Sequence, residues 1–422
     1  MNARCDVLVV GGGPVGACAA QALAADGASV TLIEKEAEVC PPVSGAHANC
    51  GLLVPSDVTP LAAPGALGQG LRWMLDNSSP FYIAPRPSAA LLRWLWLYRA
   101  AATPARARAA APVLHALHAA SAALHDQLAG EDGEGGARWL FHHDGIVQAY
   151  EAPSAMEAAT AEAEVARGYG VRANVLGAAD VRARFPGLRG HIAGALFFPE
   201  DGHMDPMLFT RAMAEMAAAS GAEALRGTEA IALEPAGRGA VKVVTTRGDF
   251  VADQVVLAAG AWTPALAKGL ALTLPIEPAK GYSVDIDRPA DFPEIPLYLG
   301  DAHCVLTPLG NALRLGSTLE LSGWDMTIRR KRVAGLRRAA QRVMGIPEDG
   351  PVRQIWRGPR PVTPDGLPVV GRVPRRERVI LATGHCMLGL SLGPITGKLV
   401  AELAGGRPPS LDLAPLSPAR FG

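Results

Sequence analysis

Residues 6–16 read DVLVVGGGPVG, an apolar run that ends in a glycine-rich turn. The run is typical of a buried parallel strand, and an alanine-rich stretch of helical composition follows at 17–25. In this context the spacing G-x-G-x-x-G predicts a dinucleotide-binding unit. Gly11 permits the tight turn, Gly13 lets the backbone approach a pyrophosphate, and Gly16 lets the helix pack closely on the strand. The first N–H groups of the helix then face the anion.

A second predicted strand, at 29–33, ends in Glu34, which lies 18 residues beyond Gly16. A carboxylate at that place accepts hydrogen bonds from ribose hydroxyls and repels a 2′-phosphate. This pattern does not by itself distinguish NAD from FAD. The flanking residues predicted to contact the same ligand are Pro14, Val15 and Lys35.

The other end of the chain favours FAD. Residues 379–384 predict a strand that breaks at glycine, and a loop and a helix from about Ile395 to Ala404 follow. Such a junction presents N–H groups and a positive dipole end, which stabilise negative charge at the N1/C2=O edge of a reduced flavin. A strand at 255–262 also ends in small residues, where backbone passes close to a cofactor. The predicted contacts from these segments are Ala259, Gly260, Trp262, Gly384, Leu388, Gly389, Leu390 and Ser391.

Length and composition narrow the class of protein further. A chain of 422 residues is long for a single core, so two domains are expected. No second G-x-G-x-x-G follows a strand, which argues against a separate NAD(P)H domain. The 40 Lys and Arg balance 40 Asp and Glu, so no excess charge favours nucleic acid. The six cysteines form no C-x-x-C pair, so reduced thiols and no metal are expected.

The sequence predicts neither a secretory signal nor a spanning helix. The chain enters a strand within a few residues, and no run of about 18 apolar residues exists. The cytoplasm is therefore the expected compartment. Residues 91–99 (LLRWLWLYR) predict an amphipathic helix. Packing in the core or between domains explains it. The alternative is a helix on the membrane surface, which would place the protein peripherally on the inner face of the membrane.

Several motifs resemble those of the D-amino acid oxidase-like superfamily of flavoproteins. The similarity covers nearly the whole chain and is closest to the bacterial D-amino acid dehydrogenases and their glycine and D-hydroxyproline relatives. The similarity is found in the segments 46–56 (AHANCGLLVPS), 61–65 (LAAPG), 71–74 (LRWM), 280–283 (KGYS) and 356–371 (WRGPRPVTPDGLPVVG). The last motif is the most specific. The resemblance implies FAD as the cofactor and further cofactor contacts at Asn49, Gly51 and Leu52.

Two motifs depart from the family pattern. The chain has Gly358-Pro359-Arg360-Pro361 where the dehydrogenases often carry Gly-Leu-Arg-Pro, and Gly384-His385-Cys386 where they often carry Gly-His-Gly. The first change stiffens the approach to Arg360, and the second places a thiol near the expected flavin. Substrate preference therefore does not simply carry over from the relatives.

The resemblance implies an α/β fold with an α+β substrate domain. A Rossmann-like FAD-binding domain is expected to carry an inserted substrate domain built on an antiparallel sheet. The predicted FAD-binding segments are 1–76, 150–189, 206–265 and 356–422. The predicted substrate-domain segments are 77–149, 190–205 and 266–355.

The implied chemistry is oxidation of an amino acid Cα–N bond to an imine, which water hydrolyses to a 2-oxo acid. Arg360 is the predicted carboxylate clamp, because a guanidinium matches a carboxylate bidentately; an ion pair is the alternative. Tyr282, after Gly281, is predicted to cover the substrate or bond its carboxylate, and a sheet tyrosine is the alternative. His47 is predicted to bond the flavin or tune the amine. A structural role is the alternative for His47 and for His203.

The leading hypothesis is an FAD-dependent D-amino acid dehydrogenase that passes electrons to a quinone or another carrier. Its expected substrate is an apolar or cyclic D-amino acid of the D-alanine or D-proline type. One alternative is an oxidase that uses O₂ and acts on glycine, sarcosine or hydroxyproline. The other is a catalytically silent FAD-bearing subunit of an electron-transfer complex, against which the presence of Arg360 and Tyr282 argues.

Overall fold

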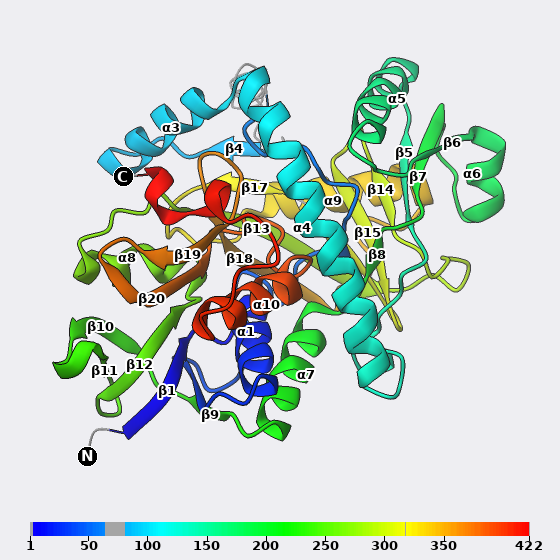
Figure 1. The fold of residues 1–422 in the computed structure, drawn as a ribbon. Helices are drawn as coiled ribbons and strands as arrows, with labels where there is room; N and C mark the ends of the chain where they lie inside the picture. Colours follow the sequence, from blue (N-terminus) through cyan, green and yellow to red (C-terminus); the bar gives the residue numbers. More distant parts are fainter. Residues whose placement is uncertain (1–2, 64–80, 317, 422) are drawn as a thin grey trace.

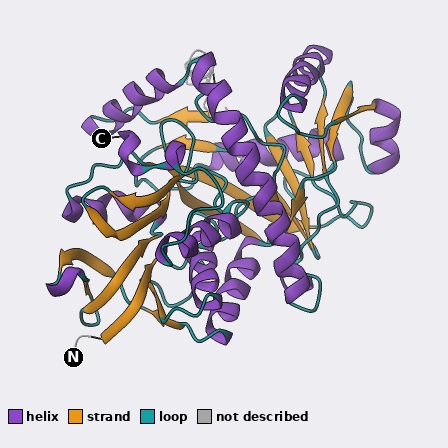
Figure 2. Ribbon diagram, viewed as in Figure 1, coloured by secondary structure: helices purple, strands orange, loops and turns teal. Residues whose placement is uncertain are grey.

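The computed structural model describes residues 3–63, 81–316 and 318–421, which form two large sheets with helices packed around them (Figure 1). Figure 2 shows helices around both sheets. The strands of each sheet come from widely separated parts of the chain. Among the sequence motifs, residues 71–74 and the end of 61–65 lie outside the described residues, as does the predicted domain boundary at 76/77.

The first sheet is built around the strand that precedes the glycine turn. That strand, β1 (Ala3–Val10), pairs in parallel with β2 (Val30–Glu34) on one side and with β12 (Phe250–Leu257) on the other. β9 (Glu223–Arg226) continues the sheet beyond β2, and β20 (Arg376–Thr383) lies beside the end of β12. The parallel order β9-β2-β1-β12-β20 thus brings together both ends and the middle of the chain.

Antiparallel strands extend this sheet at its far edge. β11 (Val241–Thr245) pairs with the first half of β12 and with β10 (Ala230–Pro235). β19 (Val369–Val373) pairs with β20. The short helix α8 (Thr263–Ala267) follows β12.

The helices α1 (Pro14–Ala25), α7 (Pro206–Ala219) and α10 (Gly393–Ala404) pack beside one another on one face of the first sheet (Figure 1). Val7 and Val9 of β1 pack with these helices, whereas Leu8 and Val10 pack in a second core on the other face. Burial on both faces explains why the strand reads as a continuous apolar run.

The second sheet centres on the long strand β13 (Glu277–Asp287), which pairs antiparallel with the whole of β18 (Gln354–Val362). On its other edge β13 meets β16 (Ala312–Gly316) and β17 (Leu319–Leu321). The sheet continues through the remaining strands in the order β15 (Cys304–Leu309), β14 (Leu297–Leu299), β5 (Ile146–Tyr150), β7 (Gly194–Phe198) and β6 (Asn174–Gly177), with β4 (Phe81–Ile83) beside β17. A separate short pair joins β3 (Leu52–Leu53) to β8 (Gly202–His203).

Helices cover the second sheet and connect it to the first. α9 (Arg330–Met344) buries Val333, Leu336 and Val343 against β13 and its neighbours. α5 (Pro153–Arg167) and α6 (Ala178–Arg184) lie at the β5-β7-β6 end (Figure 1). The long helix α4 (Pro104–Glu131) runs from one half of the molecule to the other and packs on α10.

The predicted amphipathic helix at 91–99 is present as α3 (Ala89–Ala101), which begins after Ser88, whose side chain accepts a hydrogen bond from the N–H of Leu91 at 3.2 Å. Its inner face buries Trp94 and Tyr98, whose polar ends donate to the carbonyls of residues 362 and 61. The helix therefore packs in the core along one face. In the described part of the chain no helix is both long enough and apolar enough to span a membrane.

Strand membership departs from the predicted domain segments in two places. β6 and α6, inside the segment 150–189, belong with the second sheet because β6 pairs with β7. β18, at the start of the segment 356–422, pairs with β13 in the second sheet, and the chain enters the first sheet only at β19. Pairing with strands that are distant in the sequence decides these assignments. Residue 360 lies near the end of β18, just before the chain passes from the second sheet to the first.

The close packing of α1 on β1 depends on Gly16. A Cβ at this position would lie 1.9 Å from the carbonyl oxygen of Gly11, which is backbone and cannot rotate away. We expect Gly16→Ala to lower the free energy of unfolding by about 3 kcal/mol, measured by urea denaturation. The control is Gly130→Ala in α4, where a Cβ meets nothing within 4 Å and helix propensity favours alanine. Equal stability of the two variants would contradict this packing argument.

Candidate active site

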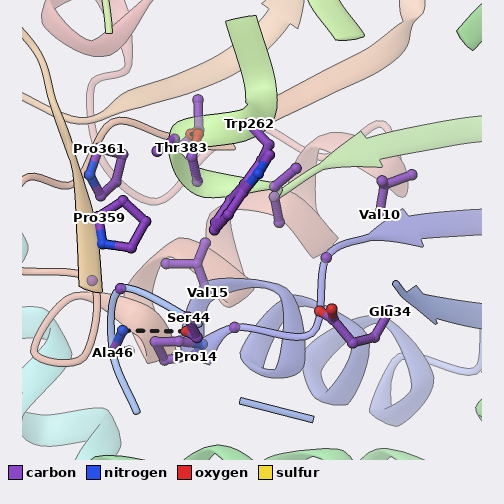
Figure 3. A pocket seen from close by; sticks show the side chains of 18 of the residues that line it. Val10, Pro14, Val15, Glu34, Ser44, Ala46, Trp262, Pro359, Pro361 and Thr383 are labelled. Carbon is purple, nitrogen blue, oxygen red and sulfur yellow. Dashed lines mark hydrogen bonds between the residues drawn. The ribbon is translucent and has the colours of Figure 1, made fainter. Parts of the chain in front are cut away.

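A cavity of about 480 Å³ opens at the carboxyl ends of β1, β2 and β12. The segments that end these strands line it, together with residues of the loop after β2, of β18 and of the loop before α10. Figure 3 shows Glu34 on one side of this first cavity and Pro359 and Pro361 on the other, with Val15 and Trp262 between them. Ligands of parallel α/β sheets bind at this edge.

The glycine turn has the geometry that a dinucleotide requires. Gly11 has a φ of +111°, and a Cβ there would lie 2.7 Å from the carbonyl oxygen of Ala258. Gly13 lines the first cavity, and a Cβ on it would meet nothing within 4 Å. The turn therefore leaves open space in front of the N-terminus of α1, where the unpaired N–H groups of a first helical turn favour an anion.

Glu34 closes the cavity at the end of β2. Its Oε2 accepts a hydrogen bond from the N–H of Gly12 at 2.7 Å, and its Oε1 accepts one from the N–H of Glu36 at 3.0 Å. Burial raises the pKa of Glu34, while these two N–H groups oppose the shift. The carboxylate is thus fixed in orientation and lines the cavity where a ribose is expected.

Trp262 forms the wall between the two ends of the first cavity (Figure 3). The ammonium of Lys35 lies 4.4 Å from the centroid of its ring, and Trp324 packs on it with the ring centroids 5.0 Å apart. These contacts hold the indole in place, so it offers a flat, fixed surface to a ligand.

The loop after β2 and the strand β18 approach each other closely at the opposite end. A Cβ on Gly45 would lie 2.4 Å from the carbonyl oxygen of Pro359, and one on Gly358 would lie 2.6 Å from that of Ser44. Within the loop, the hydroxyl of Ser44 accepts a hydrogen bond from the N–H of Ala46 at 3.2 Å (Figure 3). The two glycines allow backbone to form this wall of the cavity.

The loop before α10 supplies His385 and Cys386 to the same cavity. The Nε2 of His385 lies 2.9 Å from the hydroxyl of Thr396, and burial lowers the pKa of this histidine to about 3. Burial raises the pKa of Cys386 to about 11. At neutral pH the imidazole is therefore uncharged and the sulfur remains a thiol rather than a nucleophilic thiolate.

The residues of the first cavity fit FAD. The open space at Gly13 and the N-terminus of α1 suit a pyrophosphate, and the oriented carboxylate of Glu34 suits a ribose. The wall formed by Trp262, the prolines of β18 and the loop before α10 continues the cavity from Glu34 to the opposite side.

A second cavity of about 520 Å³ lies next to the first, between the loop at 49–61 and the strands β5, β7 and β15 of the second sheet. The two cavities share three residues, Asn49, Arg360 and Met387. A group bound in the second cavity can therefore reach a group bound in the first, and Arg360 stands at the junction.

Arg360 is a buried arginine that is 7% exposed. Its guanidinium packs over Gly281 on the neighbouring strand β13, where a Cβ would lie 2.4 Å from its Cζ. It donates one hydrogen bond, to the carbonyl of Thr318, and no carboxylate of the described residues pairs with it. Burial lowers its pKa, with Cys50 opposing the shift. A buried cation without a counter-ion is costly and is stabilised by an anionic ligand.

The structure brings most of the predicted cofactor residues to the first cavity. The residues that line it are Gly11, Gly13, Pro14, Val15, Glu34, Lys35, Asn49, Ala259, Gly260, Trp262, Gly389 and Leu390. Three others, Gly51, Leu52 and Leu388, line the second cavity instead.

Three predicted cofactor residues line neither cavity. Gly16 packs α1 on the turn, and Gly384 has a φ of +71° and packs on Thr363. Ser391 is buried, where its hydroxyl accepts a hydrogen bond from the N–H of Val54 and its carbonyl accepts one from Ser121 of α4 at 2.6 Å. These residues support the site by packing and by anchoring the loop.

Tyr282 lies away from both cavities, contrary to the predicted substrate contact. Side chains alternate along a strand, so Tyr282 points to the opposite face of β13 from Gly281, against which Arg360 packs. Its hydroxyl donates to Glu320 at 3.0 Å, within a buried cluster that includes Lys280. The alternative of a buried sheet tyrosine is the one that the geometry supports.

His47 and His203 both have structural surroundings, as the alternative interpretation of each predicted. The Nδ1 of His47 lies 2.8 Å from the carbonyl oxygen of Cys40, and His47 lines neither cavity. His203 is buried, and its ring stacks on His142 with the centroids 4.9 Å apart. Burial lowers the pKa of His203 to about 3. Both residues hold their loops in place.

Sequence reasoning missed the polar residues of the second cavity, chiefly Asp57, Asp201, Tyr298 and His303. They come from a loop after β3, a turn before β8, and the region of β14, and no motif unites them. Asp201 lies two residues before His203, and the interpretation of this motif rested on the histidine, which does not line the cavity, rather than on the aspartate, which does. No group of three or more metal-ligating side chains is present among the described residues.

Comparison with known proteins agrees with this geometry. Residues 6–403 match the family model described as FAD dependent oxidoreductase (DAO). A D-amino acid dehydrogenase of Granulibacter bethesdensis is 32% identical over 423 residues, which cover 98% of this chain and 99% of that protein. One of Rhizorhabdus wittichii is 31% identical over 98% of this chain and 100% of its own.

Solved structures agree on the fold. Glycine oxidase of Geobacillus kaustophilus has a TM-score of 0.79 and 25% identity, and the match covers 99% of this chain and 98% of that one. L-proline dehydrogenase of P. horikoshii, at 20% identity, shares the fold with a TM-score of 0.73 over 100% of this chain and 98% of its own. The predicted α/β architecture, the family resemblance and the FAD cofactor are confirmed, and this protein belongs to the DAO family of FAD dependent oxidoreductases.

Proposed function

We propose that this protein is an FAD-dependent D-amino acid dehydrogenase that converts its substrate to an imine and then a 2-oxo acid. The observation that carries the proposal is the buried guanidinium of Arg360, which has no carboxylate partner among the described residues and stands where the two cavities meet. An amino acid carboxylate supplies the missing charge. The relatives at 31–32% identity, which are named D-amino acid dehydrogenases, support the same class of reaction.

FAD, when bound, supplies the two-electron acceptor for this oxidation. The residues that hold it are those of the glycine turn, Glu34, Trp262 and the loop before α10. Arg360 binds the substrate carboxylate through two parallel hydrogen bonds and so fixes the orientation of the Cα–H bond. Its positive charge also disfavours the ammonium form of the neighbouring amine, which must lose a proton before oxidation. Water hydrolyses the imine product.

The electron acceptor distinguishes the leading function from its first alternative. A quinone or another carrier is the proposed acceptor, in line with the dehydrogenase names of the relatives. An oxidase that acts on glycine, sarcosine or hydroxyproline with O₂ is the second candidate, because the matched glycine oxidase shares the fold over the whole chain. A silent FAD-bearing subunit is disfavoured by Arg360, whose buried cation has no carboxylate partner among the described residues.

The substrate side chain extends into the second cavity. The lining of this cavity includes the apolar residues Leu52, Leu196 and Phe198. They support the expectation that the part of the substrate side chain next to Cα is apolar.

Anaerobic titration of the holoenzyme with D- and L-amino acids, including proline, hydroxyproline and glycine, tests the reaction class. We expect D-amino acids to bleach the flavin absorbance, with slow reoxidation after air is admitted. Rapid reoxidation with formation of hydrogen peroxide would make the protein an oxidase. If no amino acid bleaches the flavin, the proposed function is wrong.

Arg360→Met tests the carboxylate clamp. The substitution keeps the length of the side chain and removes the charge, so the KM for a D-amino acid should rise by about 100-fold, equivalent to about 3 kcal/mol. Thermal stability should hold or rise, because an unpaired buried cation is removed. The control is Arg357→Met on the same strand, since Arg357 lines neither cavity. A fall in stability without a change in KM would assign Arg360 a structural role instead.

We also propose that the protein associates peripherally with an anionic membrane through the outer face of α3. Leu92 is 66% exposed and Trp96 is 69% exposed, and the exposed arginines Arg93 and Arg99 lie on the same helix. Exposed Trp and Leu beside basic side chains suit the interface of an anionic bilayer. Such a location would bring the protein close to a quinone acceptor.

Vesicle sedimentation tests this association. We expect the protein to sediment with vesicles of mixed phosphatidylcholine and phosphatidylserine at low salt, and the bound fraction to fall as salt is added. The double variant Leu92→Ser and Trp96→Ser should remain in the supernatant. Val165→Ser, at an equally exposed apolar side chain of α5, serves as the control. If the unmodified protein stays in the supernatant, the membrane proposal fails.

A further inference from the structure

The second cavity carries opposite charges at its two ends. At the end shared with the first cavity lies Arg360, the single Lys or Arg among its described lining residues. Residues of α5, none of which line the first cavity, form the other end and bring the exposed carboxylate of Glu162. Asp57 and Asp201 line the cavity as well. Three carboxylates and one guanidinium therefore face the same enclosed space.

Asp57 and Asp201 differ in the described partners of their carboxylates. The N–H of Asp57 donates to the carbonyl of Val54 at 3.0 Å, but no described residue donates a hydrogen bond to its carboxylate. Asp201, in contrast, accepts hydrogen bonds from both the N–H and the hydroxyl of Ser56, at 3.0 and 2.6 Å. The loop thus fixes Asp201 and leaves Asp57 available to a ligand.

Burial makes ionisation of the two aspartates unfavourable unless a cation lies nearby. Burial alone raises the pKa of Asp57 to about 6. Burial also raises the pKa of Asp201 to about 7, with the hydrogen bonds from Ser56 opposing the shift and the charge of Asp57 adding to it. A positive group placed beside Asp57 would relieve the cost of ionising both.

Arg360 and Asp57 occupy different parts of the second cavity. Arg360 stands at the junction, because it also lines the first cavity, whereas Asp57 lines the second cavity only. In an amino acid the carboxylate and the α-amine are attached to the same carbon, and the Cα–H bond must face the first cavity. A ligand whose carboxylate pairs with Arg360 would therefore meet Asp57 with a group farther along its side chain.

The space between the two ends is suited to an aliphatic chain. Leu52, Val305 and Leu388 line it, with Phe198 and Leu196 on the strand β7. Near the Arg360 end, Thr318 lines the cavity and is 7% exposed, and no described residue forms a hydrogen bond with its buried hydroxyl. A buried unpaired hydroxyl at this place indicates a polar group of the ligand beside the carboxylate clamp.

We propose that the second cavity binds a D-amino acid with a basic side chain, whose carboxylate pairs with Arg360 and whose terminal cation pairs with Asp57. The aliphatic part of the side chain contacts the apolar wall between them. Asp201 holds the loop and adds negative potential, and Glu162 attracts the cation at the exposed edge. This inference rests on the proposed D-amino acid dehydrogenase function and narrows the predicted apolar side chain to an apolar stem with a cationic end.

Anaerobic flavin reduction by D-lysine and D-norleucine tests the inference, because the two side chains share a four-carbon stem and differ in the terminal amine. We expect the holoenzyme to prefer D-lysine by about 10-fold or more in the ratio of reduction rate to dissociation constant. Asp57→Asn should lower that value for D-lysine about 10-fold more than for D-norleucine. Asp144→Asn, at an exposed aspartate that lines neither cavity, is the matched control and should change neither value.

The melting temperature of the Asp57→Asn holoenzyme distinguishes a ligand-binding role from a structural role for Asp57, because the two roles predict changes in opposite directions. The folded state raises the pKa of Asp57 above its ordinary 3.8, so the stability it contributes is present at low pH and is lost as the pH rises through about 6. At pH 8 the Asp57→Asn holoenzyme should therefore melt at a higher temperature than the unmodified protein. A lower melting temperature, with all substrates weakened alike, would overturn the inference.

The outcomes separate this inference from the proposed function. If D-norleucine and D-alanine bleach the flavin as well as D-lysine does, the enzyme is a D-amino acid dehydrogenase, but the basic-side-chain inference is wrong. If Asp57→Asn weakens D-alanine as much as D-lysine, Asp57 binds the α-amine, which also overturns it. If no D-amino acid bleaches the flavin, the proposed function itself fails.

Discussion

The site depends on one buried charge. Arg360 lies in β18, and the antiparallel pairing of β18 with β13 sets its guanidinium over Gly281, where only a residue without a side chain leaves room. Burial denies the guanidinium water, and the described residues give it one carbonyl and no carboxylate. A protein keeps such a charge at a cost in stability. The charge is at the junction of the two cavities, where a ligand with a carboxylate removes that cost.

A second buried arginine holds the loop on which both cavities depend. Arg314 makes two hydrogen bonds of 2.8 Å to Asp285 and donates a third, of 3.1 Å, to the carbonyl of Asn49. Asp205, which caps α7, lies 3.8 Å from the same guanidinium. Here the charge is paired and the arrangement is rigid. Among the described residues Arg314 has carboxylate partners and Arg360 has none, so we propose a structural role for Arg314 and a ligand-binding role for Arg360.

The two cavities differ in the kinds of groups that line them. The first cavity is lined by backbone at the glycine turn, by the acidic residues Glu34 and Glu229 and by the flat indole of Trp262, with glycines and strand ends forming part of its wall. Charged and apolar side chains from segments that are distant in the sequence line the second cavity, and we propose that this cavity takes the substrate.

The sequence by itself determined the dinucleotide turn and the position of Glu34, because each depends on a local pattern. It also predicted the C-terminal loop as a flavin contact and, from one motif of the family, Arg360 as the carboxylate clamp, and these two roles stay predictions. It did not determine which face of β13 carries Tyr282, since a shift of one residue reverses the face and the pattern KGYS fits either. Only the tertiary structure joined Asp57, Asp201 and Arg360 around one cavity. Residues so far apart in the chain meet through sheet pairing, which no short-range signal in the sequence records.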